Sequence, residues 1–234
     1  CLPTPMSDDG SQNIDVIKKT INEINSNDQK PLIVIKSTIL PKYVKEICED
    51  VKNIIINPEF LRERFAEEDF INSDIIIFGG DNKDCEIISN FYINHTKCLS
   101  SDHTFTDHMS ASLIKYTINS FLALKVIFFN QINSVFNHIS SQNDWKSFTN
   151  AVSKDKRMGD SHMDVPGPDG RFGYGGPCFP KDVSALIEYS KELGLELSLL
   201  KKANNINNNL RAEYNDVFKR EEEQNIKFNA NKEE

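Results

Sequence analysis

The chain has 234 residues, 38% of them hydrophobic, and a formal net charge of −8, which is ordinary for a soluble globular protein. This acidic balance argues against nucleic-acid binding, which requires clustered Lys and Arg. No uninterrupted apolar run reaches the roughly 18 to 20 residues that span a bilayer, so we expect no membrane segment. The five cysteines form no Cys-x-x-Cys pair, so we expect no metal site and a reduced cytoplasmic location.

The first hundred residues alternate helical and strand patterns. Apolar residues at helical spacing, or a proline that opens a helical pattern, predict helices over residues 13–25, 41–50 and 84–92. Short runs rich in isoleucine and valine predict strands over residues 31–38, 53–57 and 73–80. Because strands and helices alternate, the sequence predicts an α/β fold with parallel strands.

The pattern changes near His103. Residues 106–139 contain no Pro or Gly and predict one helix of about 30 residues, longer than most helices of globular proteins, so we expect it to span between domains or subunits. Further helices are expected over residues 144–153, 182–193 and 198–220, with a loop rich in Gly and Pro over 158–180. The charged tail after Glu221 is expected to be disordered.

The segment Gly173–Asp182 (Gly-Tyr-Gly-Gly-Pro-Cys-Phe-Pro-Lys-Asp) can carry nucleophilic chemistry. Its glycines let the backbone approach a ligand closely. Lys181 and the start of a helix near Asp182 would favour a reactive thiolate at Cys178, and Asp182 could hold a water molecule. A structural cysteine buried in a glycine-rich loop explains the segment equally well.

Two further segments combine polar residues at helical spacing. Glu59 and Glu63 follow a predicted strand, at the end of a sheet where α/β proteins bind ligands. Lys115 and Asn119 are one turn apart on the long predicted helix, next to apolar positions. Spacing alone favours simpler interpretations, namely an acidic helix start and a polar pair on a helix surface.

Taken together, these segments resemble the UDP-glucose dehydrogenase family in order and spacing, over about residues 1–211. The resemblance includes Thr4–Pro5 in a turn, Ser37–Thr38 at a strand end, and the segments 155–159 and 166–170. It implies a partial Rossmann-like parallel sheet followed by a mainly helical central domain with one long helix. The implied organisation is the C-terminal part of an NAD-binding domain (1–103), a central dimerisation and substrate domain (104–221) and a polar tail (222–234).

The resemblance also implies a reaction. Family members oxidise UDP-glucose twice with NAD, through a thiohemiacetal and a thioester on a cysteine that matches Cys178. The implied catalytic residues are Cys178, Lys115, Asn119, Asp182, Glu59, Glu63 and Thr38. The implied cofactor contacts are Thr4, Thr38, Glu63 and Lys181. The implied substrate contacts are Glu59, Phe60, Leu61, Lys115, Asn119, Arg157, Phe172, Tyr174 and Gly175. A homodimer through the long helix is also implied.

The chain departs from the family pattern in two respects. It has no Gly-x-Gly-x-x-Gly turn to hold the NAD pyrophosphate, and it has no second α/β domain for the nucleotide. It begins with Cys1 and reads as a sequence that starts inside a domain, so we expect marginal stability and little activity of the chain alone. The alternatives are a dehydrogenase of GDP-mannose or a UDP-acetamido sugar, or an inactive remnant that dimerises. Retention of the catalytic set favours a working enzyme over the remnant, and the Phe-Pro-Lys-Asp sequence after Cys178 resembles the UDP-glucose branch more than the other two.

Overall fold

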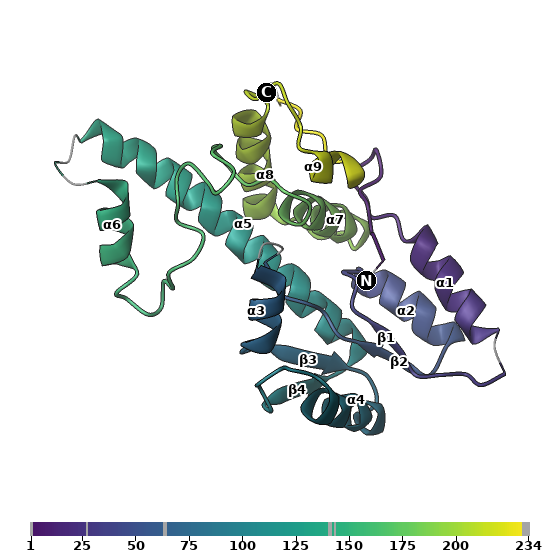
Figure 1. The fold of residues 1–234 in the computed structure, drawn as a ribbon. Coiled ribbons are helices and arrows are strands. Elements are labelled where there is room, and N and C mark those ends of the chain that lie inside the picture. The colour runs from purple at the N-terminus through teal and green to yellow at the C-terminus, as the bar shows by residue number, and fades with distance from the viewer. Residues whose placement is uncertain (1, 27, 63–64, 140–141, 143, 231–234) are drawn as a thin grey trace. The chain divides into compact units, whose positions relative to one another are not determined.

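The computed structural model describes residues 2–26, 28–62, 65–139, 142 and 144–230. The chain divides into two compact units (Figure 1). Unit 1 comprises Cys1–Pro5 and Gln12–Thr117, and unit 2 comprises Met6–Ser11 and Ile118–Glu234. The long helix α5 (His108–His138, 31 residues) contributes residues to both units, which confirms the long helix that the sequence predicts.

Unit 1 is built on a four-stranded sheet in the order β1-β2-β3-β4. The strands are β1 (Ile33–Ile35), β2 (Ile54–Ile56), β3 (Ile76–Gly79) and β4 (His103–Thr106). The pairs β1–β2 and β3–β4 are parallel, as expected, but β2 and β3 pair antiparallel. A parallel neighbour needs a crossover long enough to return the chain to the same end of the sheet. The six-residue α3 (Ala66–Ile71) between β2 and β3 is much shorter than the usual crossover helix.

The isoleucine runs of unit 1 form strands because both faces of the sheet are covered. All residues of β2 and β3 are buried, which explains why these segments are apolar throughout rather than alternating. The other helices of unit 1 are α1 (Asp15–Asn25), α2 (Pro41–Asp50) and α4 (Asn82–His95). Apolar side chains of α1 and α2 form one core with the sheet, and α4 packs in a second core around Phe78 and Cys85.

Two elements of unit 1 do not appear in the sequence prediction. Strand β4 reads His-Thr-Phe-Thr and is partly or fully exposed at the edge of the sheet, so it lacks the apolar run that identifies a buried strand. Helix α3 has three acidic residues in its first turn and no buried residue. Both elements are therefore held by their pairing or packing partners rather than by a strong local pattern.

Unit 2 is helical in its described residues. It contains the C-terminal part of α5, with α6 (Trp145–Val152), α7 (Phe179–Glu192), α8 (Ser198–Arg211) and α9 (Lys219–Glu223). Ala123 and Ile127 of α5 pack with Val183 and Ile187 of α7 in its main core. The predicted helix over 198–220 was too long, because the helix ends at Arg211.

The C-terminal segment differs from its prediction. Residues after Glu221 were expected to be disordered because they are charged. Instead, Glu221 is 0% exposed and Ile226 is 3% exposed. Asn225 donates a hydrogen bond to the Met6 carbonyl, and Lys227 pairs with Asp8. For the described residues 222–230 the prediction was wrong, because the polar groups of this segment find partners within unit 2, which composition does not report. Residues 231–234 lie outside the described residues.

Helix α5 is long and apolar enough, by length and composition, to cross a membrane; within the described residues it is the one helix of this kind. The search for uninterrupted apolar runs missed this property because Lys115 and Lys125 lie in the helix. A core helix of a globular protein meets the same criterion, and α5 supplies Tyr116 and Ile127 to the buried interior.

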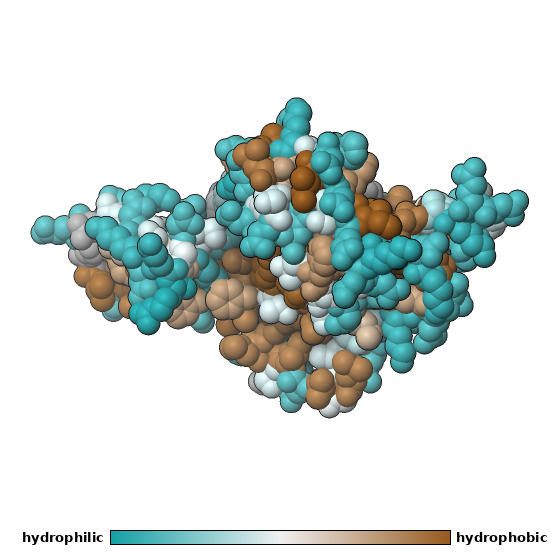
Figure 2. Space-filling view, turned by 90° about the horizontal axis from the view of Figure 1, so that it is seen from below, coloured by the Kyte–Doolittle hydropathy of each residue, from teal (hydrophilic) through white to brown (hydrophobic). Residues whose placement is uncertain are grey.

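Hydrophobic side chains also lie on the surface of unit 1. Helix α4 and strand β4 are the lowest elements in Figure 1, and Figure 2 looks at the molecule from that side, where brown hydrophobic residues gather. The large exposed hydrophobic residues of these two elements are Ile87, Phe91, Ile93 and Phe105.

Candidate functional site

Unit 1 brings together two of the segments that the sequence singled out. Lys115 on α5 is 5% exposed, and its Nζ donates a hydrogen bond to the backbone carbonyl of Glu59 at 2.5 Å. The same Nζ lies 3.7 Å from Glu59 Oε1 and 5.1 Å from the centre of the Phe60 ring. Glu59 Oε2 in turn accepts a hydrogen bond from the Leu61 amide at 2.8 Å. Glu63, the other expected carboxylate, lies outside the described residues.

The Glu59 segment is anchored by a buried asparagine that the sequence analysis missed. Asn57, at the end of β2, is 1% exposed, and its Nδ2 donates to the Ile77 carbonyl at 2.9 Å. Its Oδ1 accepts hydrogen bonds from Lys36 Nζ at 2.7 Å and from the Tyr92 hydroxyl at 2.6 Å. A polar residue directly after a buried run of isoleucines is the signal that could have indicated this anchor, since a buried amide needs partners.

The N-terminal segment of unit 1 is tied to the turn that follows β1. The Leu2 amide donates to Ser37 Oγ at 2.8 Å, and Ser37 Oγ donates to the Leu2 carbonyl. Gln12 is buried and donates its Nε2 to the Thr38 carbonyl at 2.8 Å. Thr4 is 4% exposed. The expected cofactor residues Thr4 and Thr38 therefore lie in turns with fixed backbones, and Gln12 was not foreseen as the residue that fixes one of them.

Unit 2 brings together a second set of expected residues around Asp182. Asn119 Nδ2 donates to Asp182 Oδ2 at 2.6 Å, and Lys181 Nζ lies 2.5 Å from Asp182 Oδ1. The three residues are 5%, 8% and 1% exposed for Asn119, Lys181 and Asp182. Asp182 lies in the first turn of α7, where the helix N-terminus stabilises negative charge. The carboxylate is thus held by an amide, an ammonium group and a helix end.

Cys178 directly precedes α7. It is the N-cap residue of the helix, and its carbonyl accepts a hydrogen bond from the Asp182 amide at 3.0 Å. The helix begins at Phe179 rather than at Asp182, so the thiol is closer to the helix N-terminus than the sequence predicts. A helix N-terminus favours the thiolate form of a cysteine.

Exposure separates Cys178 from the other described cysteines. Cys178 is exposed, whereas Cys85 and Cys98 are buried and Cys48 is half-buried. Burial raises the pKa of the thiols of Cys48 and Cys85. The alternative that Cys178 is a structural cysteine buried in a glycine-rich loop is therefore wrong, and its position suits a nucleophile.

The remaining expected substrate residues of unit 2 differ in their surroundings. The Arg157 side chain is 89% exposed, and its Nη2 pairs with Asp155 Oδ2 at 2.6 Å, which raises the pKa of Arg157. Phe172 is 41% exposed. Tyr174 is 3% exposed, and burial raises the pKa of its hydroxyl. Phe172 and Arg157 thus present side chains to solvent, while the Tyr174 ring packs in the core.

The loop before Cys178 is held by asparagine side chains. The Gly173 amide donates to Asn130 Oδ1 at 3.0 Å, and the Tyr174 amide donates to Asn207 Oδ1 at 2.6 Å. Asn207 Nδ2 also donates to the Tyr174 carbonyl at 3.0 Å. Gly173 has a φ of +74° and a Cβ at this position would lie 2.5 Å from Asn207 Oδ1, so only glycine fits.

Lys115 and Asn119 are four residues apart in the continuous helix α5, so they lie on one face of it. Each contacts a carboxylate-bearing partner: Lys115 contacts Glu59 in unit 1 and Asn119 contacts Asp182 in unit 2. Among the residues described, no group of three or more His, Cys, Asp or Glu side chains could hold a metal ion.

Comparison with known proteins assigns this arrangement to a family. Residues 1–95 match the model of the NAD-binding domain of the UDP-glucose/GDP-mannose dehydrogenase family. Residues 109–209 match the model of the central domain of the same family. The chain belongs to this family.

Curated relatives and a solved structure agree with this assignment. UDP-glucose 6-dehydrogenase of Rickettsia bellii is 36% identical over 205 residues, which cover 84% of this chain and 45% of the relative. UDP-glucose 6-dehydrogenase YwqF of Bacillus subtilis is 29% identical over 220 residues, 89% of this chain and 48% of the relative. A UDP-glucose dehydrogenase structure from Pyrobaculum islandicum matches with a TM-score of 0.71 and 30% identity, over 87% of this chain and 48% of that chain. The chain thus spans about half the length of these family members.

The match to an NAD-binding domain identifies NAD as the cofactor. The residues present fit part of such a site. Unit 1 supplies the N-terminal segment that carries Thr4 and the turn after β1 that carries Thr38. The 234-residue sequence contains no Gly-x-Gly-x-x-Gly turn, the element that cradles the pyrophosphate in dinucleotide-binding folds.

Proposed function

We propose that these residues serve an enzyme that oxidises the C6 hydroxyl of UDP-glucose to a carboxylate through a covalent intermediate on Cys178. The observation that carries the proposal is the exposed thiol at the N-terminus of α7, one turn before a buried Asp182 that binds Asn119. Nucleophile, carboxylate and amide donor are the groups that such a reaction needs. The family and the relatives named above support the substrate class.

The reaction has four steps. Oxidation at C6 gives an aldehyde, to which the Cys178 thiolate adds to form a thiohemiacetal. A second oxidation gives a thioester, and attack by water releases the carboxylate and returns the thiolate. When bound, NAD⁺ accepts the hydride that leaves C6 in each oxidation.

The chain's own residues stabilise charge and move protons in these steps. Lys115 Nζ and Asn119 Nδ2 would donate hydrogen bonds to the oxygen of the tetrahedral species, where negative charge develops. Asp182 would orient the attacking water, with Glu59, Glu63 and Thr38 assisting proton transfer. Lys115 Nζ lies 3.7 Å from the Glu59 carboxylate, and Asn119 Nδ2 donates a hydrogen bond to the Asp182 carboxylate. Each donor therefore lies near a carboxylate that can accept a proton, which supports these pairings.

The binding residues are proposed on the same grounds. For the nucleotide sugar we propose Glu59, Phe60, Leu61, Lys115, Asn119, Arg157, Phe172, Tyr174 and Gly175. For NAD we propose Thr4, Thr38, Glu63 and Lys181. The Lys181 ammonium group contacts Asp182, so its contribution includes holding that carboxylate. The division into residues 1–103, 104–221 and 222–234, and a cytoplasmic location, belong to the same proposal.

We further propose that two copies pair through α5. Three side chains spaced seven residues apart on this helix, Phe121, Phe128 and Val135, are 64%, 52% and 57% exposed. Within unit 2, Phe121 and Phe128 border a mainly apolar groove of 570 Å³ between α5 and α8. A seven-residue apolar spacing is typical of helices that pair along their length, and exposed apolar side chains gathered along one helix favour association.

The function is tested by trapping the covalent intermediate. The chain, and separately a longer family member containing the same site, would be incubated with UDP-glucose and NAD, and the Cys178 peptide analysed by mass spectrometry. In the longer enzyme we expect a glucuronyl adduct on the cysteine that corresponds to Cys178, and none when that cysteine is replaced by serine. Replacing the position that corresponds to Cys48 by serine is the matched control and should keep the adduct. NADH formation at the wild-type rate in Cys178→Ser would refute the mechanism.

Two alternatives are separated by the same experiment. A GDP-mannose or UDP-acetamido sugar dehydrogenase would form the adduct with that sugar nucleotide and not with UDP-glucose. A remnant without activity would form no adduct with any of them. Burying the Asp182 carboxylate costs desolvation free energy even though Asn119 and Lys181 contact it. A group that is costly to bury favours an active enzyme over a remnant without activity.

A further inference from the structure

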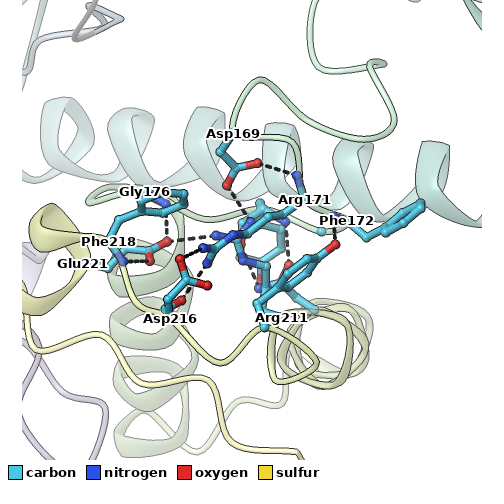
Figure 3. A network of polar contacts seen from close by, with 12 residues as sticks. Asp169, Arg171, Phe172, Gly176, Arg211, Asp216, Phe218 and Glu221 are labelled. Atoms are coloured by element: carbon cyan, nitrogen blue, oxygen red, sulfur yellow. Dashed lines mark hydrogen bonds and ion pairs between the residues drawn. The ribbon is translucent and has the colours of Figure 1, made fainter.

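A buried ion pair from the C-terminal segment contacts the loop that leads to Cys178. We refer to residues 169–176 as the glycine loop and to residues 212–228 as the C-terminal segment. Figure 3 shows Asp169, Arg171, Phe172 and Gly176 of the loop joined by hydrogen bonds and ion pairs to α8 and to the C-terminal segment. All of these residues belong to unit 2.

Glu221 lies at the centre of this network. Its side chain and that of Arg211 are both 0% exposed. Glu221 Oε1 accepts hydrogen bonds from the Gly176 amide at 2.8 Å and from Arg211 Nη2 at 3.0 Å. Glu221 Oε2 accepts a hydrogen bond from the Phe218 amide at 3.0 Å. One carboxylate therefore joins the end of the glycine loop, the end of α8 and the start of α9.

Arg211 extends the network to the other end of the glycine loop. Its Nη1 lies 2.6 Å from Asp169 Oδ2, and Asp169 Oδ1 accepts a hydrogen bond from the Arg171 amide at 3.1 Å. A Cβ added at Gly175 would overlap Arg211 Nη2 and lie 2.6 Å from Glu221 Oε1. The loop backbone therefore packs directly against the buried pair, and only a glycine permits this approach.

The outer side of the loop is held by the same C-terminal segment. Arg171 Nη2 lies 2.6 Å from Asp216 Oδ2, and its guanidinium carbon lies 4.1 Å from the centre of the Phe218 ring. The Phe172 amide donates to the Tyr214 hydroxyl at 3.0 Å. Arg211 and the C-terminal segment lie after residue 209, where the match to the family's central-domain model ends. The family model therefore does not describe these contacts.

We propose that Glu221 is a positioning residue for Cys178. Its carboxylate, neutralised by Arg211, fixes the Gly176 amide two residues before the thiol, and the C-terminal segment thereby sets where the loop enters α7. The role given to Cys178 rests on the proposed function, but the loop conformation and the reactivity of the thiol can be measured without NAD or a sugar nucleotide.

The test uses the full chain with Glu221→Ala, and with Glu221→Gln as a variant that keeps the size of the side chain and an acceptor for the Gly176 amide. Glu223→Ala changes an exposed carboxylate of the same short helix and is the matched control. Two quantities are measured at neutral pH: hydrogen exchange of the amides of residues 173–176, and the rate of alkylation of Cys178 by iodoacetamide, resolved by peptide mass spectrometry.

In Glu221→Ala we expect exchange at Gly176 to be at least about tenfold faster, the lower end of the range that corresponds to one lost hydrogen bond to a charged group. We expect alkylation of Cys178 to be about threefold slower or more, because a loosened loop moves the thiol from the helix N-terminus that favours the thiolate. Glu221→Gln should recover most of the Gly176 protection and of the alkylation rate, a rescue that a loss of stability alone does not produce.

The proposal is overturned if folded Glu221→Ala, judged by circular dichroism, changes neither quantity more than Glu223→Ala does. It is also overturned if exchange accelerates while the alkylation rate stays at the wild-type value, since Glu221 then holds the loop without positioning the thiol. Should the alanine variant not fold, Glu221→Gln decides alone. Changes of both quantities in the same directions that exceed those of Glu223→Ala support the proposal, and changes no larger than those of Glu223→Ala refute it. Failure of the sugar oxidation leaves both readouts intact, so the two proposals fail separately.

Discussion

Removal of Arg211 should destabilise unit 2 strongly. In Arg211→Met, the Glu221 carboxylate loses its 3.0 Å contact and Asp169 loses its 2.6 Å contact. Because the Glu221 side chain is 0% exposed, water cannot replace the guanidinium group. Breaking a buried pair in this way costs roughly 3 to 5 kcal/mol. Glu221 keeps its bonds from the Gly176 and Phe218 amides, so we expect the lower end, about 3 kcal/mol.

The double variant Arg211→Met/Glu221→Gln gives the sharper comparison. It removes both charges of the pair, and a neutral pair of similar volume avoids most of the desolvation cost, so we expect a loss of only about 1 kcal/mol. Arg220→Met, which removes one partner of an exposed pair with Glu223, is the control and should change stability by less than about 1 kcal/mol.

Urea unfolding followed by tryptophan fluorescence measures these changes in unit 2. Trp145 is the one tryptophan in the sequence, and it packs against Phe129 and donates its Nε1 to the Met163 carbonyl. Its emission therefore reports the unfolding of unit 2. If Arg211→Met lay within about 1 kcal/mol of the wild type, or if the double variant were as unstable as the single one, the assignment of a buried, charge-paired Glu221 would be wrong.

Three further predictions concern the thiols, the anchor of the Glu59 segment and the groove. At pH 7 iodoacetamide should label Cys178 before Cys48 and Cys85, because burial raises the pKa of the latter two thiols. Labelling of Cys85 should increase only near its raised pKa or on unfolding. Equal labelling rates for all three cysteines would contradict this prediction. Asn57→Ala should lower the free energy of unfolding of unit 1 by about 2 to 3 kcal/mol in urea titrations followed by circular dichroism, since it removes the three hydrogen bonds of a buried amide. Lys36 and Tyr92 keep the hydrogen bond between them, and an effect below about 1 kcal/mol would show that water replaces the lost amide. Phe128→Glu should sediment as a monomer where the wild type sediments as a dimer. If Phe128→Glu sediments with the same dimer mass as the wild type, pairing through α5 is rejected.

The sequence predicts the elements whose local pattern is strong. The isoleucine runs at residues 54–56 and 76–78 identify buried strands because no other element of that length is apolar throughout. The absence of Pro and Gly from His108 to His138 identifies α5. By contrast, β4 was missed, because its strand pairing with β3 lies in the backbone and its side chains show no apolar run.

The candidate site likewise contains residues that the sequence predicts and supporting residues that it does not. The residues with family-like spacing could be located from the sequence, and the structure brings Lys115 to Glu59 and Asn119 to Asp182. Their supporting residues could not be located, because a buried polar pair such as Arg211 and Glu221 leaves no periodic signal: each member reads as a surface residue until its partner is known. The predicted disorder was wrong for residues 222–230 for this reason.

Three of the side chains that hold the glycine loop come from three different helices. Asn130 is on α5, Asn207 on α8 and Glu221 on α9, and each accepts a different backbone amide of the loop. A nine- or ten-residue peptide copied from around Cys178 would therefore not keep this conformation. Transplanting the cysteine loop into another scaffold would require the three helices as well, and the smallest portable form of this site is close to the whole of unit 2.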